Sequence, residues 1–242
     1  MEKIFDIHNH ILWGVDDGSK DLDMSLRMLK MAQDDGITDM ILTPHNKPNR
    51  RNIYVTEMVE QIEELKSAMQ NQGISVNLYP GNEIYYRLDV YERFQNGKAA
   101  TMVGSRYVLI EFNPMDEWSY IKHGADEMLM AGYFPIIAHV ERFANVIKDI
   151  DRVYELKDKG CYIQINASSL MGEIGWGIKK QCKTLIKQGL VSFVATDAHE
   201  DVKRVPKLSE SVRYITKKFG EETARKIFET NPQCILEDKI IR

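Results

Sequence analysis

Short apolar runs alternate with longer amphipathic stretches along the whole 242-residue chain, and this alternation constrains the fold more than any other feature. The apolar runs have the length and composition of strands that are covered on both faces. We predict seven strands: Ile4–Ile7, Asp39–Thr43, Val76–Tyr79, Tyr107–Phe112, Phe134–Ala138, Tyr162–Ile165 and Phe193–Ala195.

The amphipathic stretches between these runs predict helices. They cover residues 21–35, 55–71, 117–131, 149–159, 176–188, 207–218 and 221–230. Asp21 and Thr56 suit the N-cap position. A glycine follows the last turn of five stretches, where a left-handed residue is needed: Gly36, Gly73, Gly132, Gly160 and Gly189. Repeated strand–helix units predict parallel strands with right-handed crossovers.

No linker or low-complexity segment divides the chain, so we expect one α/β domain over residues 1–242. A closed barrel is the economical arrangement of seven such units, and an open doubly wound sheet is the alternative.

Composition excludes several classes of protein. The chain has 32 Lys+Arg against 36 Asp+Glu and a net charge of −4, so it lacks the electrostatic footprint of a general nucleic-acid binder. No apolar run approaches the roughly 20 residues that span a bilayer, and the N-terminus lacks the pattern of a signal peptide. We therefore expect no membrane insertion and a cytoplasmic location.

Cys161, Cys182 and Cys234 are widely separated and are expected to be reduced, packed thiols.

Residues with metal-binding side chains collect at the predicted strand ends. His8 and His10 follow the first strand, and on an extended segment they face the same side. Further candidates lie at or just beyond later strand ends: Asp16 or Asp17, His45, Glu83, Glu111, His139, Asp197 and His199. In a parallel barrel the C-terminal strand ends meet at one mouth, so these side chains are expected to converge there.

This mixture of imidazole and carboxylate groups is typical of a metal site. A buried, unpartnered carboxylate such as Glu111 is costly, and a cation removes that cost. Imidazole and carboxylate ligands without thiolates suit Mn²⁺, Fe²⁺ or Zn²⁺ better than Ca²⁺. Nine ligands exceed the needs of one ion, so two or three ions are expected. Neighbouring ions can share a hydroxide and hold both the attacking and the leaving oxygen of a phosphoryl transfer.

Six segments together resemble a known family. They are DIHNHILWGVDDG at 6–18, TPH at 43–45, GNEIYY at 81–86, LIEF at 109–112, HVER at 139–142 and TDAH at 196–199. In order and spacing they are similar to the PHP (polymerase and histidinol phosphatase) superfamily, and within it to the bacterial manganese-dependent tyrosine-protein phosphatases of capsule and exopolysaccharide operons. The resemblance implies a distorted seven-stranded (β/α)7 TIM-like barrel of the PHP type.

The resemblance also implies a trinuclear metal site. One ion would be held by His8, His10, Glu83 and Asp197, a second by Glu83, Glu111 and His139, and a third by Asp17, His45 and His199. The second aspartate of the family's DDG matches Asp17, although spacing alone leaves Asp16 open. Arg142 and Arg204 match the positions that the family uses for the substrate phosphate.

The implied activity is that of a Mn²⁺-dependent protein-tyrosine phosphatase that attacks phosphorus with a metal-activated hydroxide, with Fe, Zn or Mg as alternative metals. The implied substrate is the tyrosine-rich C-terminal tail of an autophosphorylating bacterial kinase that governs polysaccharide export. One alternative is a small-molecule phosphatase such as histidinol-phosphatase, and another is a non-catalytic, metal-stabilised regulator that binds the kinase. The chain departs from the family at Asn46, where many relatives carry His, and at Val140, where Pro is common.

The loop at residues 45–51 is locally basic, which indicates either a solvated surface or an attraction for anionic phosphopeptides.

Overall fold

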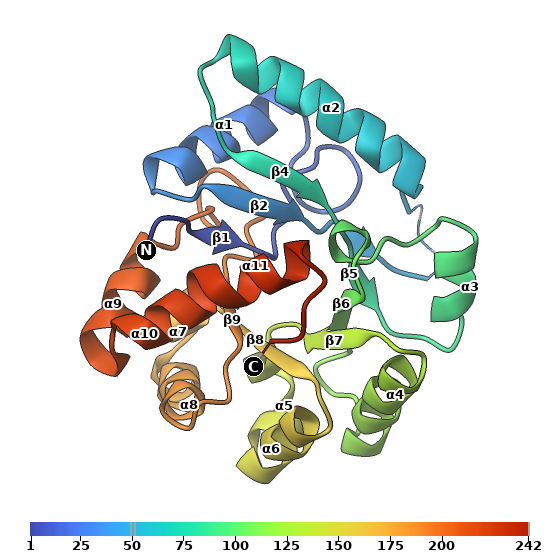
Figure 1. The fold of residues 1–242 in the computed structure, drawn as a ribbon, viewed down its shortest axis with the longest axis vertical. Helices are drawn as coiled ribbons and strands as arrows, with labels where there is room; N and C mark the ends of the chain where they lie inside the picture. The colour runs from blue at the N-terminus through green and yellow to red at the C-terminus, as the bar shows by residue number, and fades with distance from the viewer. Residues whose placement is uncertain (49, 51, 242) are drawn as a thin grey trace.

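Parallel strands form the centre of the molecule, which we describe for residues 1–48, 50 and 52–241 of a computed structural model (Figure 1). Asn49 and Arg51 of the basic loop lie outside the described residues. The strands are β1 (Phe5–Asp6), β2 (Asp39–Leu42), β3 (His45–Asn46), β4 (Asn77–Pro80), β5 (Glu83–Tyr85), β6 (Tyr107–Glu111), β7 (Phe134–Ile137), β8 (Tyr162–Asn166) and β9 (Phe193–Ala195). They pair in the orders β1-β2-β4 and β3-β5-β6-β7-β8-β9, always in parallel.

The sheets curl so that the first and last strands meet. Beyond their ends, Asn9 and Ala198 form a parallel bridge, and the His10 amide donates to the Ala198 carbonyl at 2.8 Å. The seven predicted segments all overlap strands, but a count of seven is not confirmed, because the structure describes nine. The two additional strands, β3 and β5, follow interruptions at residues 43–44 and 81–82. At the first interruption Pro44 has no amide hydrogen to pair with, and its carbonyl accepts from Asn82 Nδ2 at 2.8 Å.

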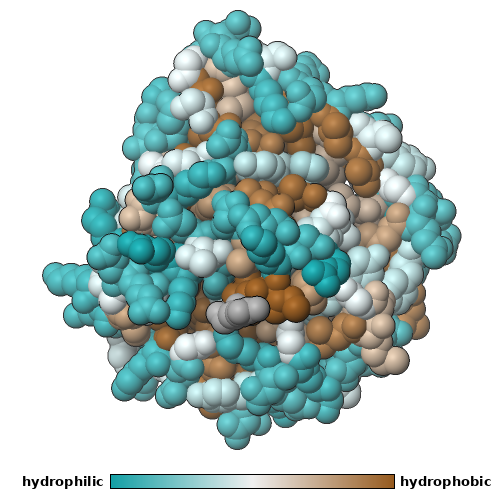
Figure 2. Space-filling view, in the orientation of Figure 1, coloured by the Kyte–Doolittle hydropathy of each residue, from teal (hydrophilic) through white to brown (hydrophobic). Residues whose placement is uncertain are grey.

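Helices cover the outside of the curled sheets and, at the C-terminus of the chain, cross one of their ends (Figure 1). They are α1 (Leu22–Asp34), α2 (Val55–Asn71), α3 (Val90–Gln95), α4 (Trp118–Met130), α5 (Ala144–Ile147), α6 (Ile150–Asp158), α7 (Ala167–Met171), α8 (Trp176–Lys187), α9 (Ser209–Phe219), α10 (Glu221–Arg225) and α11 (Asn231–Leu236), with 3-10 turns η1 (Met102–Gly104) and η2 (Val140–Arg142) and a π-helical turn η3 (Lys226–Thr230). Among the described residues, no helix combines the length and apolarity needed to cross a membrane. Figure 2 shows that hydrophilic residues dominate the face viewed, with hydrophobic ones exposed mainly in strips between them.

Helix ends follow the local sequence in most cases. The five glycines predicted to end helices all have positive φ, from 64° at Gly73 to 107° at Gly160, and are confirmed. Asp21 caps α1 by accepting from the Met24 amide at 2.8 Å, as predicted. The prediction for Thr56 is wrong, because α2 begins at Val55 after Tyr54. The last predicted helix continues beyond residue 230, because the π-helical turn η3 leads directly into α11.

Alternate residues of the strands face two different cores. Tyr107 and Leu109 of β6 belong to an inner cluster, whereas Val108 and Ile110 pack outward against the helices. Ile235 of α11 packs into the inner cluster, and in Figure 1 this helix crosses the middle of the view. The apolar interior and α11 therefore fill one end of the curled sheet, and the C-terminal strand ends at the opposite end are left for polar side chains.

The loop that follows His10 depends on one glycine. A Cβ built on Gly18 would lie 2.1 Å from the His10 carbonyl oxygen and 2.5 Å from its Cβ. We therefore expect Gly18→Ala to lower the free energy of unfolding by about 3 kcal/mol, because the clash is with backbone that cannot rotate away. Gly177→Ala in α8 is the matched control, since its Cβ meets nothing within 4 Å. Urea denaturation of both variants tests this expectation, and an equal stability for the two would contradict it.

Candidate metal centre

The C-terminal ends of the strands bring the nine predicted ligand residues together. They form four overlapping groups, and within each group the ligand atoms lie within 4.8 Å of one another. The groups are His10 with Asp17, His45 and His199; His8 with His10 and Asp197; His8 with Glu83 and His139; and His45 with Glu83 and Glu111. His8 and His10 follow β1, Asp17 lies in the loop between β1 and α1, and His45 and Glu83 begin β3 and β5. Glu111 ends β6, His139 follows β7, and Asp197 and His199 follow β9. Residues separated by up to 191 positions therefore share one cluster.

Glu83 lies at the centre of this cluster. Its Oε1 is 2.8 Å from His139 Nε2 and 3.3 Å from His8 Nε2, and its Oε2 is 2.7 Å from His45 Nδ1 and 3.4 Å from His10 Nε2. The side chain is fully buried. Burial by itself raises the pKa of this carboxyl, but His8 and His45 outweigh burial and hold the pKa well below its usual range. Glu83 is therefore a carboxylate with both oxygens facing imidazoles.

Asp197 has two differently engaged oxygens. Oδ1 lies 3.6 Å from His8 Nε2 and 3.4 Å from His10 Nε2, on the side of the imidazoles. Oδ2 forms ion pairs with Arg142 Nη1 at 3.0 Å and with Arg204 Nη2 at 2.8 Å. Burial raises the pKa of Asp197, but His8 and the other neighbouring imidazoles lower it well below normal. Only Oδ1 is thus directed into the cluster.

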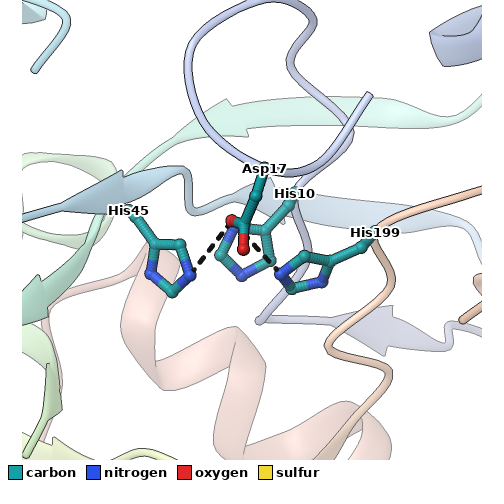
Figure 3. Close-up of side chains that lie close together, drawn as sticks. All are labelled: His10, Asp17, His45 and His199. Atoms are coloured by element: carbon teal, nitrogen blue, oxygen red, sulfur yellow. Dashed lines mark ion pairs between the residues drawn. The ribbon is translucent and has the colours of Figure 1, made fainter. Parts of the chain in front are cut away.

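Asp17 closes the outer side of the cluster. Figure 3 shows its carboxylate above the rings of His10, His45 and His199. Oδ1 lies 3.4 Å from His45 Nε2 and 3.7 Å from His199 Nε2, and the side chain is 71% exposed. This arrangement makes the outer group the one most open to solvent.

Asp16 plays a different part from its neighbour. Its Oδ2 is 2.7 Å from His10 Nδ1 and accepts from the His45 amide at 2.8 Å, and its Oδ1 accepts from the Gly18 amide at 2.9 Å. Burial opposes ionisation of Asp16, but His10 outweighs it and the pKa falls to about 2. The structure therefore places Asp17 in the cluster and Asp16 behind it, holding the His10 ring.

The orphaned polar atoms test whether a metal fits here. Six buried ligand-type atoms in the cluster have no hydrogen-bond partner among the described residues: His8 Nε2, His10 Nε2, His45 Nδ1, Glu83 Oε2, Glu111 Oε2 and His139 Nδ1. Buried polar atoms are rarely left without a partner, and all of these except His139 Nδ1 face other atoms of the cluster. Imidazole nitrogens and carboxylate oxygens in this density fit two or more divalent transition ions.

Backbone strain accompanies two of the nine residues. His139 has φ 34° and Asp197 φ 52°, both in the left-handed region that side chains other than glycine rarely adopt. Such strain persists only where the surroundings enforce it, and it is concentrated at functional sites.

The two predicted phosphate-binding arginines lie beside the cluster. Arg142 ends η2 and Arg204 lies in the loop after β9, and their side chains are 33% and 42% exposed. Both line a cavity of about 670 Å³ that also reaches Asp197. Planar guanidinium groups at such a mouth are placed to bind the oxygens of a phosphate.

Two buried amides of the site were missed by the sequence predictions. Gln164 and Asn166 on β8 are both fully buried and contact cluster residues. The signal was present, because residues 164 and 166 are polar at alternate positions of an otherwise apolar strand and so face the same side.

The metal-free protein is expected to become less stable at alkaline pH. Burial lowers the pKa of His8 and His10, but nearby carboxylates, Glu83 for His8 and Asp16 for His10, outweigh burial and raise both above 6.5. Above pH 7 the folded protein therefore binds more protons than the unfolded chain, and the free energy of unfolding falls as pH rises. Deprotonation also favours metal binding, so Mn²⁺ affinity is expected to rise over the same interval.

Thermal unfolding in chelator between pH 7 and 8.5 checks this expectation. His8→Asn should flatten the decline, whereas the exposed His123→Asn should leave it unchanged. A melting temperature that rises with pH in the metal-free protein would contradict the expectation.

Sequence comparisons reveal close relatives. Residues 4–237 match a family described as capsular polysaccharide synthesis, CpsB/CapC. The chain is 37% identical to the "Putative tyrosine-protein phosphatase CapC" of Staphylococcus aureus over 82% of this chain and 78% of that protein. It is 32% identical to the tyrosine-protein phosphatase CpsB of Streptococcus pneumoniae, over 98% of this chain and 100% of that protein.

Solved structures agree with the sequence comparisons. A structure described as YwqE from Bacillus subtilis and CpsB from Streptococcus pneumoniae, "unique metal-dependent tyrosine phosphatases", superimposes with a TM-score of 0.92 and 29% identity, over 99% of this chain and 96% of that one. A phosphotriesterase homology protein from Escherichia coli superimposes with a TM-score of 0.66 at 10% identity, over 97% and 99% of the two chains. The latter similarity concerns the fold alone.

Proposed function

The chain belongs to the CpsB/CapC family of capsular polysaccharide synthesis, and from this premise we propose that it is a metal-dependent protein-tyrosine phosphatase. The observation that carries the proposal is the convergence of imidazole and carboxylate groups beside two arginines. The relatives named as tyrosine-protein phosphatases include one of which this chain covers the full length.

In this proposal the nine side chains hold two or three divalent ions, and Mn²⁺ is the metal. The nine ligands would be divided among the ions as the resemblance implies, and Glu83 would be a ligand of two ions. The four imidazoles around Glu83 support this role. When bound, such ions supply hydroxide at neutral pH and offset charge on phosphoryl oxygens. Every other step falls to the side chains of the protein.

Arg142 and Arg204 bind the phosphate in this proposal. Their guanidinium groups lie on the cavity side of Asp197, so a phosphoryl group between them and the cluster would meet positive charge on both sides. Charge that grows on the phosphoryl oxygens in the transition state is stabilised there. A phenolate is a better leaving group than an alkoxide, because its parent pKa is near 10, and so it needs less protonation.

The thiols have no part in the proposed reaction. Cys161 and Cys182 are buried, and burial raises the pKa of the Cys161 thiol to about 12 and that of Cys182 further. A thiol with so high a pKa is a poor nucleophile at neutral pH.

We further propose that the substrate is the phosphorylated C-terminal tail of a bacterial tyrosine kinase of polysaccharide export, and that the enzyme acts in the cytoplasm. Residues 1–242 form one domain in this proposal, and the two sheets form one distorted barrel with seven strand positions, in which β3 continues β2 and β5 continues β4. The three-residue steps from Leu42 to His45 and from Pro80 to Glu83 support that continuity.

Phosphate release tests the proposed function. Purified protein is treated with chelator and then supplied with Mn²⁺, and hydrolysis of a phosphotyrosyl peptide is compared with hydrolysis of histidinol phosphate. We expect activity on the peptide that is lost on chelation and restored by Mn²⁺. A higher kcat/KM for histidinol phosphate would favour the small-molecule phosphatase instead, and metal binding with no phosphate release from either ester would favour the non-catalytic regulator.

A further inference from the structure

Strand β8 differs from its neighbours at the metal centre, because it supplies none of the nine clustered side chains. It contributes amides instead. Gln164 and Asn166 are fully buried and lie on the inward face of the strand, whereas Ile163 and Ile165 pack outward into the layer beneath the helices. Two uncharged polar side chains in this position would be costly without a full set of hydrogen bonds.

Each amide has a hydrogen-bond partner for its oxygen and for one N–H, and together the two amides form a chain of hydrogen bonds. Gln164 Oε1 accepts from the backbone amide of His139 at 2.7 Å and lies 3.1 Å from His8 Nδ1. Gln164 Nε2 donates to Asn166 Oδ1 at 2.8 Å, and Asn166 Nδ2 donates to Asp197 Oδ2 at 2.8 Å. The chain therefore links three of the clustered residues through two side chains that are not in the cluster.

The direction of this chain is fixed at both ends. The backbone amide of His139 can only donate, so the Gln164 atom that faces it must be the oxygen. The carboxylate of Asp197 can only accept, so the Asn166 atom that faces it must be the nitrogen. With both amides oriented in this way, His8 Nδ1 must carry the hydrogen that points at Gln164 Oε1, and the opposite ring atom, Nε2, is left to face Glu83 and Asp197.

The same chain holds the two strained residues of the site. His139 and Asp197 are the clustered residues with positive φ, and the chain ends on the backbone of one and the side chain of the other. On Asp197 it engages Oδ2, which leaves Oδ1 directed at the imidazoles. A left-handed backbone at a residue other than glycine needs such restraint to persist.

We propose that Gln164 and Asn166 are positioning residues that set the tautomer of His8 and the conformations of His139 and Asp197 in ligating geometry. The proposal rests on the proposed metal centre but not on the identity of the substrate. Partners that hydrogen-bond to metal ligands change metal affinity by about 10- to 100-fold when removed, which sets the scale expected here.

Mn²⁺ binding by titration calorimetry tests the proposal without any substrate. Gln164→Leu and Asn166→Leu keep the approximate volume and remove the hydrogen bonds, and each is expected to weaken Mn²⁺ binding by about 10- to 100-fold. Because the two amides act through one chain, the double variant should bind scarcely more weakly than the worse single variant. The matched control is Ile165→Ala, which removes a fully buried outward-facing side chain of the same strand. It should lower the melting temperature and leave Mn²⁺ affinity within about twofold.

A spectroscopic measurement keeps the proposal falsifiable if a variant folds poorly. In the diamagnetic Zn²⁺-loaded wild-type protein, ¹⁵N–¹H spectra of the histidine rings should show His8 with a slowly exchanging hydrogen on Nδ1. A hydrogen on Nε2 of His8 would overturn the proposal, as would variant affinities equal to that of wild type, effects that simply add in the double variant, or wild-type protein that binds no Mn²⁺. If Mn²⁺ binds as expected but phosphotyrosine is not hydrolysed, the proposed function fails and the positioning role stands.

Discussion

Glu83→Gln is expected to abolish phosphatase activity, with kcat/KM for a phosphotyrosyl peptide falling by about 10³-fold or more. The substitution preserves the shape of the side chain and removes the charge that faces four imidazoles. An amide presents only one acceptor oxygen, so it cannot bridge two ions. The variant should therefore also retain fewer equivalents of Mn²⁺ after gel filtration than wild type does, as measured by elemental analysis.

Asp39→Asn provides the matched control for loss of a buried carboxylate. Asp39 begins β2, at the end of the strand away from the cluster, and its side chain is fully buried and accepts from Tyr79 Oη at 3.1 Å. Its neutralisation should reduce stability and leave both metal content and kcat/KM within about twofold of wild type. Normal metal content and activity in Glu83→Gln would exclude a central role for that carboxylate.

Arg142→Ala is expected to lower kcat/KM by about 10²- to 10³-fold and to leave the metal content unchanged. Its guanidinium contacts only Asp197 Oδ2 within the cluster, at 3.0 Å, and faces the cavity from there. Arg142→Lys should recover only part of the loss, because an ammonium cannot bind two phosphate oxygens in a planar fork.

Arg152→Ala is the control for removal of a half-buried arginine. Arg152 lies on α6 and pairs with Asp149 at 3.6 Å, away from the cavity. Steady-state kinetics with a phosphotyrosyl peptide should therefore separate the two arginines clearly. A loss of activity in Arg152→Ala as large as in Arg142→Ala, or full activity in Arg142→Lys, would contradict phosphate binding by Arg142.

The sequence predicted the strands and the convergence of the metal-binding side chains well, because both follow from local patterns along the chain. Apolar runs mark the strands, and parallel strands place residues at their C-terminal ends on one side, so Glu111 and His139 could be brought together without knowledge of the structure. The break between β2 and β3 was not predictable in the same way. It depends on hydrogen bonds such as that from Asn82 to the Pro44 carbonyl, which join segments remote in sequence.

The parts of the site that were missed depend on tertiary hydrogen bonds. Spacing alone left Asp16 and Asp17 equivalent. Their contacts separate them, because Asp16 lies 2.7 Å from His10 Nδ1 whereas Asp17 lies 3.4 Å from His45 Nε2. Gln164 was not a candidate ligand, because an amide has no chemistry of its own that marks a metal site. The polar alternation in the sequence indicates that Gln164 faces inward, but its partner, the His139 amide, is set by the pairing of β8 with β7.

Anomalous diffraction from crystals grown with Mn²⁺ tests the central claim most directly. We expect two or three peaks among the nine clustered side chains, at about 2.0–2.3 Å from their nitrogen and oxygen atoms. Two of these peaks should lie on opposite sides of the Glu83 carboxylate. A single peak, or none, or manganese bound elsewhere with these imidazoles directed away from one another, would contradict a multinuclear centre.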